Sequence, residues 1–283
     1  MATESAVFGT VRPQKRSTWF LPREHGATAM LFTPIVCAAI LSHTWRWSEL
    51  ATVTAAFAAL TAKDPMVVLA RQRFVWKQWH EETSAAMRWF VGWTVLLILS
   101  GLVLLASWPF KATAALGLGV AVFSVLAIAI NVRNRQRSTL FQIASAAALS
   151  SSSLATSLSA TGKIAPWCWW LWLLLALQAT SGILVVHARL DARIALRSTA
   201  PARENYRRAA QISLLALACA AVIATAFHHG WIALALFVAI LGYAYDLHRQ
   251  RNAEALQLPL KSVGQRALAL SSLYAVLLII GLW

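Results

Sequence analysis

The chain is a succession of long apolar segments separated by shorter polar ones. A helix needs roughly 17 to 25 residues to cross about 30 Å of hydrocarbon, and most of the apolar segments reach that length. The first and the eighth segments are shorter. The pattern predicts nine transmembrane helices, over approximately Ala27 to Leu41, Glu49 to Ala70, Arg88 to Ser107, Ala112 to Ile130, Leu140 to Ala160, Trp167 to His187, Ala209 to Phe227, Trp231 to Tyr245 and Ala267 to Trp283.

Composition supports this pattern and argues against a soluble globular domain. Hydrophobic residues make up 59% of the 283 residues, only 12% are charged, and the mean hydropathy is +0.62. We therefore predict an all-α polytopic membrane protein. The three cysteines lie inside apolar segments without Cys-x-x-Cys spacing, so we expect no zinc site. The organisation predicted is a polar, basic cytoplasmic segment over residues 1–20 and a nine-helix transmembrane domain over residues 21–283.

The basic residues predict the orientation of the chain. Cytoplasmic loops carry the excess of Lys and Arg, and a cytoplasmic N-terminus leaves only Arg46, Lys111 and Lys163 of the 25 basic residues outside. One span more or fewer would destroy this asymmetry. We therefore expect a multi-pass protein of the cell (inner) membrane, with its C-terminus outside. The formal net charge of +15 then reflects topology and contact with anionic lipid, and we expect no nucleic-acid partner.

A short motif, Leu-Pro-Arg-Glu-His-Gly-Ala over residues 21 to 27, stands where the polar segment meets the first predicted helix. It places Arg23, Glu24 and His25 at the membrane boundary. A carboxylate next to an imidazole suits acid–base chemistry, so Glu24 and His25 are candidate catalytic residues and Arg23 a candidate ligand-binding residue. The alternative is an interfacial anchor, in which the charged side chains reach the head groups and His25 has no chemical role.

Two polar clusters follow the second and fourth predicted helices on the same side. Asp64 and Arg71 are seven residues apart and share a helical face, where they either bind a ligand or form a weak ion pair. The next cluster runs from Asn131 to Gln142 and contains three arginines at alternate positions. It resembles an anion cradle, and an ordinary positive-inside loop is the alternative. Its candidate ligand-binding residues are Asn131, Arg133, Arg135 and Gln142.

The end of the sixth predicted helix carries the most informative spacing. Arg189, Arg193 and Arg197 repeat every four residues on one face, while His187 and Asp191 lie four apart on another. One face offers positive charge to a phosphate, and the other offers a base beside a carboxylate. Asp191 is therefore a candidate catalytic residue, and His187, Arg189 and Arg193 are candidates for ligand binding. An amphipathic helix end resting on anionic head groups is the alternative. Asp246 and His248 repeat the pairing more weakly after the eighth helix.

Two families resemble this sequence. The Leu-Pro-Arg-Glu-His-Gly-Ala motif before an apolar helix resembles the opening of the YwiC-like family of bacterial membrane proteins. The wider layout is similar to the UbiA-type intramembrane prenyltransferases, with nine helices, polar cytoplasmic loops after helices two, four and six, and an Arg-x-Arg-Ser-Thr-x-x-Gln passage from Arg135 to Gln142. This second resemblance implies a UbiA-like bundle with a cavity that faces the cytoplasm.

The chain departs from the prenyltransferase pattern at the acids that hold magnesium in that superfamily. The first aspartate motif falls on Lys63, Asp64, Val67 and Arg71, so one acid of three remains. The second retains Asp191 alone, since His187 and Ala195 stand on either side. Mg²⁺ prefers oxygen ligands, so a magnesium site is disfavoured and no cofactor is assigned. The arginines would then neutralise a phosphate directly, namely Arg71, Arg133, Arg135, Arg189 and Arg193.

Three hypotheses follow for the function. The first is a UbiA-like protein that binds a prenyl or other lipid with an anionic head in a cytoplasm-facing cavity, so that its partner is a membrane lipid or an isoprenoid. The second is a prenyltransferase-like enzyme that acts on a phosphorylated lipid. The third is a transporter or an accessory membrane subunit whose intramembrane polar residues mark a substrate path. The degenerate aspartate motifs favour the first.

Overall fold

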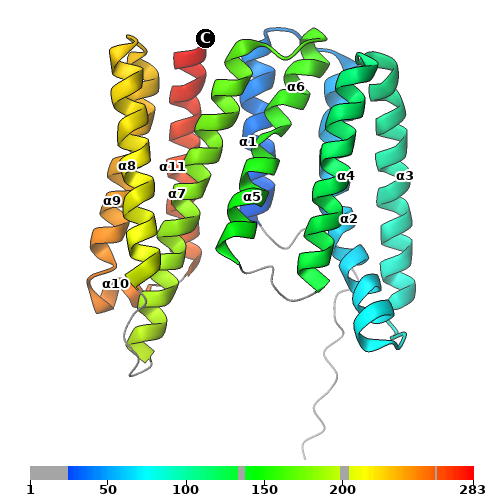
Figure 1. Ribbon diagram of the computed structural model, residues 1–283, viewed down its shortest axis with the longest axis horizontal. Coiled ribbons are helices and arrows are strands. Elements are labelled where there is room, and N and C mark those ends of the chain that lie inside the picture. Colours follow the sequence, from blue (N-terminus) through cyan, green and yellow to red (C-terminus); the bar gives the residue numbers. More distant parts are fainter. Residues whose placement is uncertain (1–24, 133–137, 198–203, 259) are drawn as a thin grey trace, which may run out of the picture.

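The structure is a computed structural model that describes residues 25–132, 138–197, 204–258 and 260–283. The described residues form helices and loops and contain no strand (Figure 1). The helices are α1 (His25–Ser42), α2 (Trp47–Arg71), the π-helical turn η1 (Gln72–Trp76), α3 (Thr83–Ser107), α4 (Phe110–Val132), α5 (Thr139–Ser150), α6 (Ser152–Thr161), α7 (Pro166–Arg197), α8 (Glu204–Ala226), α9 (Gly230–Arg249), α10 (Ala253–Gln257) and α11 (Leu260–Leu282).

All nine predicted apolar segments are helical. Among the described residues, seven helices are long and apolar enough to cross a membrane, and α1 is a shorter apolar helix over Gly26–Ser42. The prediction of an all-helical polytopic membrane protein is therefore confirmed. The eighth segment is longer than predicted, because α9 continues to Arg249 and has 20 residues.

The fifth segment differs from its prediction, since it is not one continuous helix. The chain breaks between α5 and α6 at Ser151, in the middle of four consecutive serines. The Ser151 hydroxyl donates to the carbonyl of Ala148 at 2.7 Å, and the Ser153 hydroxyl donates to that of Ser150 at 2.9 Å. These hydroxyls compete with backbone N–H groups for the carbonyls of the preceding turn, and such bonds bend a helix. This explains why the helix is interrupted at the serines.

The helix that contains the sixth predicted segment is longer than that segment. The helix α7 has 32 residues and continues ten residues beyond His187, where the prediction ended the membrane span. Arg189 and Arg193 therefore stand on the same rigid helix as the apolar residues that precede them. Half of the residues in the most apolar window of α7 are buried, a larger share than in any other candidate span of the described chain.

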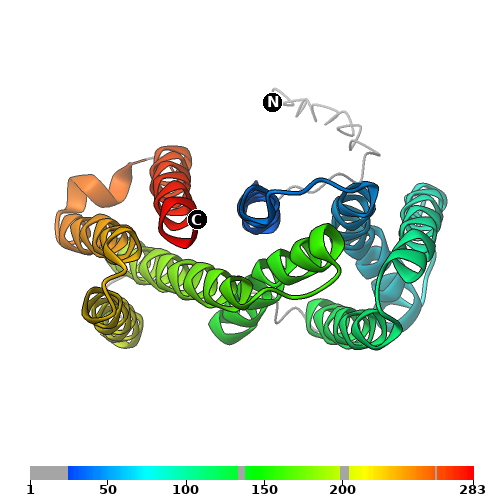
Figure 2. The same ribbon diagram turned by 90° about the horizontal axis from the view of Figure 1, so that it is seen from above.

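The helices form three groups. Seen from above, α2, α3 and α4 make one side of the molecule, α7, α8, α9 and α11 make the other, and α1, α5 and α6 lie between them (Figure 2). The main hydrophobic core joins α1 to the second group, with Leu171, Leu217, Leu236 and Leu278 fully buried. The Tyr274 hydroxyl also donates to the carbonyl of Leu174 at 3.1 Å, which fixes α11 against α7.

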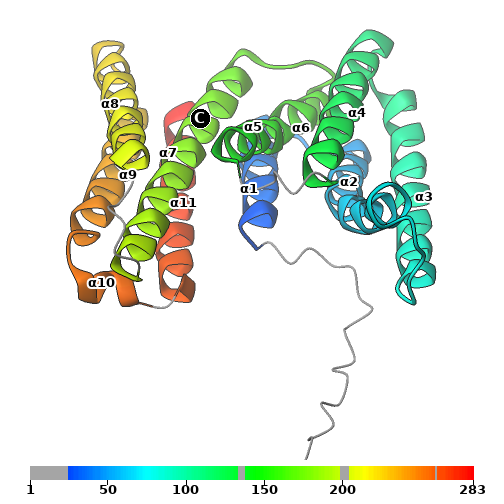
Figure 3. The ribbon, with the colours of Figure 1, turned by 60° about the horizontal axis from the view of Figure 1, so that its bottom comes forward.

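Basic side chains gather at one end of this bundle. The helix α1 begins there and α2, α7 and α9 end there, whereas α11 ends at the opposite side (Figure 1). The short helix α10 lies across this end and connects α9 with α11 (Figure 3). We call this end of the bundle the basic end, after Arg71, Arg189, Arg193, Arg249 and Arg266.

Candidate functional site

A cavity of about 630 Å³ lies among α1, α5, α7, α9 and α11. Its wall is largely apolar and includes Met30, Leu175, Val186 and Leu268. It begins near Gly26 in the first turn of α1, at the basic end, and extends inward along α7 from Arg189 to Leu175, about four helical turns. Polar residues interrupt the apolar wall at two depths. They are Arg189, Asp246, Gln142, Gln250 and Gln265 toward the basic end, and Gln178, Tyr243, Ser271, Ser150 and Thr33 deeper in the bundle.

Arg189 is the principal charged group of the wall. Only 6% of it is exposed, and its Nη2 donates to the backbone carbonyl of Ala255 in α10 at 2.6 Å. Its Nε is buried and has no hydrogen-bond partner among the described residues. A buried N–H of a charged group that lacks a partner costs more than about 1 kcal/mol, so this guanidinium suits a ligand that supplies an anionic acceptor.

Arg189 belongs to a group of charges from three helices. The charges of Arg193, Asp246, Arg249 and Arg266 all act on Arg189, and two of these arginines also act on Asp246. Four arginines against one aspartate leave this group positive. A hydrogen bond at 3.1 Å from the Gln250 amide to the carbonyl of Val185 holds the end of α9 against α7. The basic end of the cavity is thus electrostatically suited to an anion.

Deeper in the cavity, three polar side chains meet in one hydrogen-bonded group. The Nε2 of Gln178 donates to the Tyr243 hydroxyl at 2.7 Å and to the Ser271 hydroxyl at 2.9 Å. The Tyr243 hydroxyl in turn donates to the backbone carbonyl of Gln178 at 3.1 Å. Gly182 makes room for this contact, because a Cβ there would lie 2.9 Å from the Tyr243 oxygen. The group joins α7, α9 and α11.

The structure brings three of the predicted site residues together. Gln142 and Arg189 line the same cavity. The Nε2 of His187 lies 3.0 Å from Oε1 of Gln142, so these side chains bridge α7 and α5. The His187 ring also stacks on Tyr206 of α8, with ring centroids 5.1 Å apart. Arg193 joins the site through its charge. Asp191 does not line the cavity, and its Oδ2 is buried without a hydrogen-bond partner within the described ranges.

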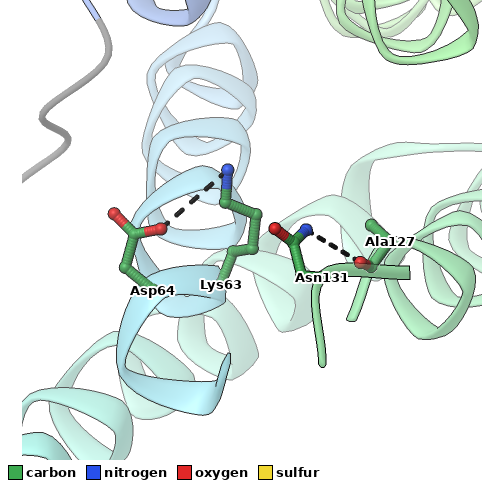
Figure 4. Close-up of polar contacts among 4 residues, drawn as sticks. All are labelled: Lys63, Asp64, Ala127 and Asn131. Atoms are coloured by element: carbon green, nitrogen blue, oxygen red, sulfur yellow. Dashed lines mark hydrogen bonds and ion pairs between the residues drawn. The ribbon is translucent and has the colours of Figure 1, made fainter. Parts of the chain in front are cut away.

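Three other predicted residues lie in a separate cluster on α2 and α4. Asp64 faces Lys63, whose Nζ is 3.9 Å from the carboxylate, and the Asn131 amide donates back to the carbonyl of Ala127 at 2.8 Å (Figure 4). Arg71 donates from Nη2 to the carbonyl of Asn131 at 2.7 Å. None of these residues lines the cavity.

The rest of the predicted site is described only in part. Arg23, Glu24, Arg133 and Arg135 lie outside the described residues. The backbone of His25 forms the first residue of α1, next to Gly26 in the cavity wall. The opening motif therefore leads directly into the wall of the cavity.

Magnesium, which the prenyltransferase resemblance implies, does not fit the described donors. The ammonium group of Lys63 lies beside Asp64, the one acid that remains of the first aspartate motif. No group of three or more His, Cys, Asp or Glu side chains within the part of the chain described is placed to hold a metal ion. These residues therefore do not rebuild the magnesium site of that superfamily.

Sequence reasoning missed most of the polar wall. Gln178, Tyr243 and Ser271 were not predicted, and Arg249 and Arg266 were not among the candidate site residues. A signal for Gln178 does exist, because an amide in the middle of a long apolar helix is costly unless it is bonded and faces the protein interior.

The fold and the cavity define a polytopic α-helical membrane protein with an amphipathic cavity at the basic end of its bundle. A family model described as YwiC-like protein matches residues 21–157. Over these residues, just under half of the chain, the match confirms the resemblance to the YwiC-like family that the opening motif indicated. Searches of the curated proteins and of the solved structures found no match.

Proposed function

We propose that this protein binds a prenyl or other lipid that has an anionic head group, in the cavity among α1, α5, α7, α9 and α11. The observation that carries the proposal is the buried Nε of Arg189, which has no partner among the described residues at the charged end of a largely apolar cavity. A phosphate oxygen accepting from this N–H would complete the hydrogen bonds of the guanidinium.

The volume and the wall of the cavity support a lipid-sized ligand. A cavity of about 630 Å³ lies within the roughly 300 to 1,000 Å³ that small-molecule sites occupy. In the proposed pose the head group lies by Arg189, on which the charge of Arg266 also acts, and the tail extends along Met30, Leu175 and Leu268. Burial of the tail supplies affinity, while the arginines fix its direction.

The nine-span topology with a cytoplasmic N-terminus is part of this proposal. Two observations support it: α1 begins at the basic end and α11 ends at the opposite one (Figure 1), and the basic residues concentrate at one end. In this topology the cavity faces the cytoplasm of a bacterial cell, in a UbiA-like bundle with degenerate aspartate motifs.

Two alternatives each have an observation in their favour. A prenyltransferase-like enzyme acting on a phosphorylated lipid is supported by the Asp246 carboxylate, which lines the cavity beside the arginines. A transporter or accessory subunit is supported by the break between α5 and α6, because Ser150 at the break lines the cavity. Broken helices are a common feature of transporter binding sites.

Thermal unfolding of the purified protein in a non-ionic detergent tests the proposal. A ligand that binds the native state raises the apparent stability. We expect dodecyl phosphate and an isoprenyl diphosphate to raise the unfolding temperature, with or without Mg²⁺, and dodecanol to raise it less. Arg189→Ala should weaken binding of the phosphate by about 10- to 100-fold, the value of a charge-assisted hydrogen bond. Arg197→Ala is the matched control, since Arg197 is exposed at the end of the same helix.

The outcomes separate the hypotheses. Equal shifts with dodecyl phosphate and dodecanol, or equal losses in both arginine variants, would contradict the proposal. A shift that requires Mg²⁺, together with release of diphosphate, would favour the enzyme. Flux of the lipid across reconstituted vesicles would favour the transporter.

A further inference from the structure

We infer that the ligand carries a second polar group, a hydroxyl, which hydrogen-bonds to Gln178 and Ser271 deep in the cavity. The inference rests on the proposed function, because it assumes that an amphiphile enters the cavity with its anionic head at Arg189. Gln178 precedes Arg189 by 11 residues on α7, which is about three helical turns or 16 Å. The two polar groups of the ligand would lie at a comparable separation.

The hydrogen bonds around Gln178 leave one acceptor and one donor without partners. Both bonds that its amide nitrogen makes are directed to hydroxyls, those of Tyr243 and Ser271. Tyr243 gives its hydrogen to the backbone carbonyl of Gln178. No hydrogen bond within the described ranges uses the side-chain oxygen of Gln178 or the hydrogen of the Ser271 hydroxyl. Both residues line the cavity, and Gln178 is only 5% exposed.

The helix α1 has a carbonyl that lacks its usual helical donor, at a residue of the same cavity wall. Pro34 has no N–H, so the carbonyl of Met30 lacks the donor that an α-helix normally provides four residues later. Met30 and Pro34 both line the cavity. Backbone groups freed in this way inside a membrane protein are normally satisfied by neighbouring side chains, water or ligand.

A purely hydrocarbon tail does not suit this part of the wall. It would cover polar atoms that otherwise form hydrogen bonds with water or with a polar ligand. Each hydrogen bond lost in this way is unfavourable. A ligand hydroxyl can accept from Ser271 and donate to the oxygen of Gln178 at once. Bonds between helices alone would account for the Gln178 nitrogen and for Tyr243. They do not use the hydrogen of the Ser271 hydroxyl or the side-chain oxygen of Gln178, and both residues line the cavity.

Binding of paired alkyl phosphates and ω-hydroxyalkyl phosphates, from octyl to tetradecyl, tests the inference. A terminal hydroxyl weakens binding to an apolar wall, so a preference for the hydroxylated probe requires polar partners. We expect one chain length to show the preference, with about 5- to 10-fold tighter binding than its alkyl counterpart. Ser271→Ala should abolish this preference, whereas Ser271→Thr should retain it. Ser272→Ala is the matched control, because Ser272 is the exposed neighbour on α11.

The results distinguish failure of this inference from failure of the proposed function. If alkyl phosphates bind with dependence on Arg189 but no hydroxylated probe is preferred, the inference is wrong and the proposed function stands. A preference that survives in Ser271→Ala also overturns the inference. If no alkyl phosphate of any length binds, the proposed function fails and the inference fails with it.

Discussion

The two sides of the molecule are built from similar apolar helices, yet only one of them contributes to the cavity. In the most apolar windows of α3 and α4, 11% and 6% of the residues are buried, against 50% in α7. On the first side Arg71 bonds to the backbone of Asn131. On the second side Arg189 and Gln178 are buried and line a cavity. The two sides differ in what their polar side chains face, which is the backbone of a neighbouring helix on the first side and the cavity on the second. The overall hydropathy of the helices does not reveal this difference.

The family match covers one part of the cavity wall. The matched residues 21–157 include α1, α5 and most of α6. They provide Met30, Gln142 and Ser150. The other walls, with Arg189, Gln178 and Ser271, come from α7, α9 and α11 in the second half of the chain. A ligand in the cavity would therefore contact both halves.

Among substitutions that compare the two sides, the largest effect is expected from filling the cavity. Gly264 on α11 lines it, and a Cβ built there meets nothing within 4 Å. Gly264→Trp should place an indole in the ligand's space and weaken binding of dodecyl phosphate more than about 10-fold, because tail burial supplies much of the affinity. The measurement is a titration followed by thermal unfolding.

The matched control for this substitution lies on the other side of the molecule. Gly119 on α4 also has open space around its Cβ position and does not line the cavity. Gly119→Trp should leave binding unchanged. Equal losses in the two variants would show that the ligand site is not this cavity.

An intermediate effect is expected at Gly182, where α7 approaches Tyr243. Gly182→Ala forces the Tyr243 hydroxyl away from its present position, since the new Cβ would lie 2.9 Å from it. We expect a loss of about 1–3 kcal/mol in the free energy of unfolding, the usual cost of overpacking. Gly101→Ala on α3, where no atom lies within 4 Å of the Cβ position, should not lose stability. If Gly182→Ala is as stable as Gly101→Ala in urea or detergent unfolding, the tight packing around Gln178 is contradicted.

The smallest effect is expected at Asp64 on the first side. Asp64 faces Lys63 on the same helix and does not line the cavity. Asp64→Asn should therefore leave the affinity for dodecyl phosphate unchanged, with and without Mg²⁺. A Mg²⁺-dependent loss of binding in this variant would instead place the head group at the degenerate aspartate motif and move the site to α2.

The apolar pattern was enough to predict the long helices, but not their ends and breaks or the short elements η1 and α10. Apolar residues have high hydropathy whether they face lipid or the protein core, so all nine segments were found. It does not describe local competition for hydrogen bonds, and the break at Ser151 was therefore missed. Nor does it mark the end of a helix whose last turns are polar, as the continuation of α7 to Arg197 shows.

The candidate site was predicted where a charge pattern exposed it. The four-residue spacing of the arginines selected Arg189, and the polar cluster that runs into the first turn of α5 selected Gln142. Their meeting across one cavity depends on which helices are neighbours, and spacing along one chain does not specify that. The group of Gln178, Tyr243 and Ser271 joins residues 65 and 93 positions apart, so no local pattern could have revealed it.

The most direct test is photocrosslinking with an alkyl phosphate that carries a diazirine in its chain, followed by mass spectrometry of the labelled peptides. We expect the labels to concentrate on α1, α7 and α11, at residues such as Met30, Leu175 and Leu268. Excess dodecyl phosphate should prevent this labelling, and Gly264→Trp should abolish it. Labels spread over α3 and α4 without competition would show only contact with lipid at the protein surface. That result would contradict a ligand cavity at Arg189.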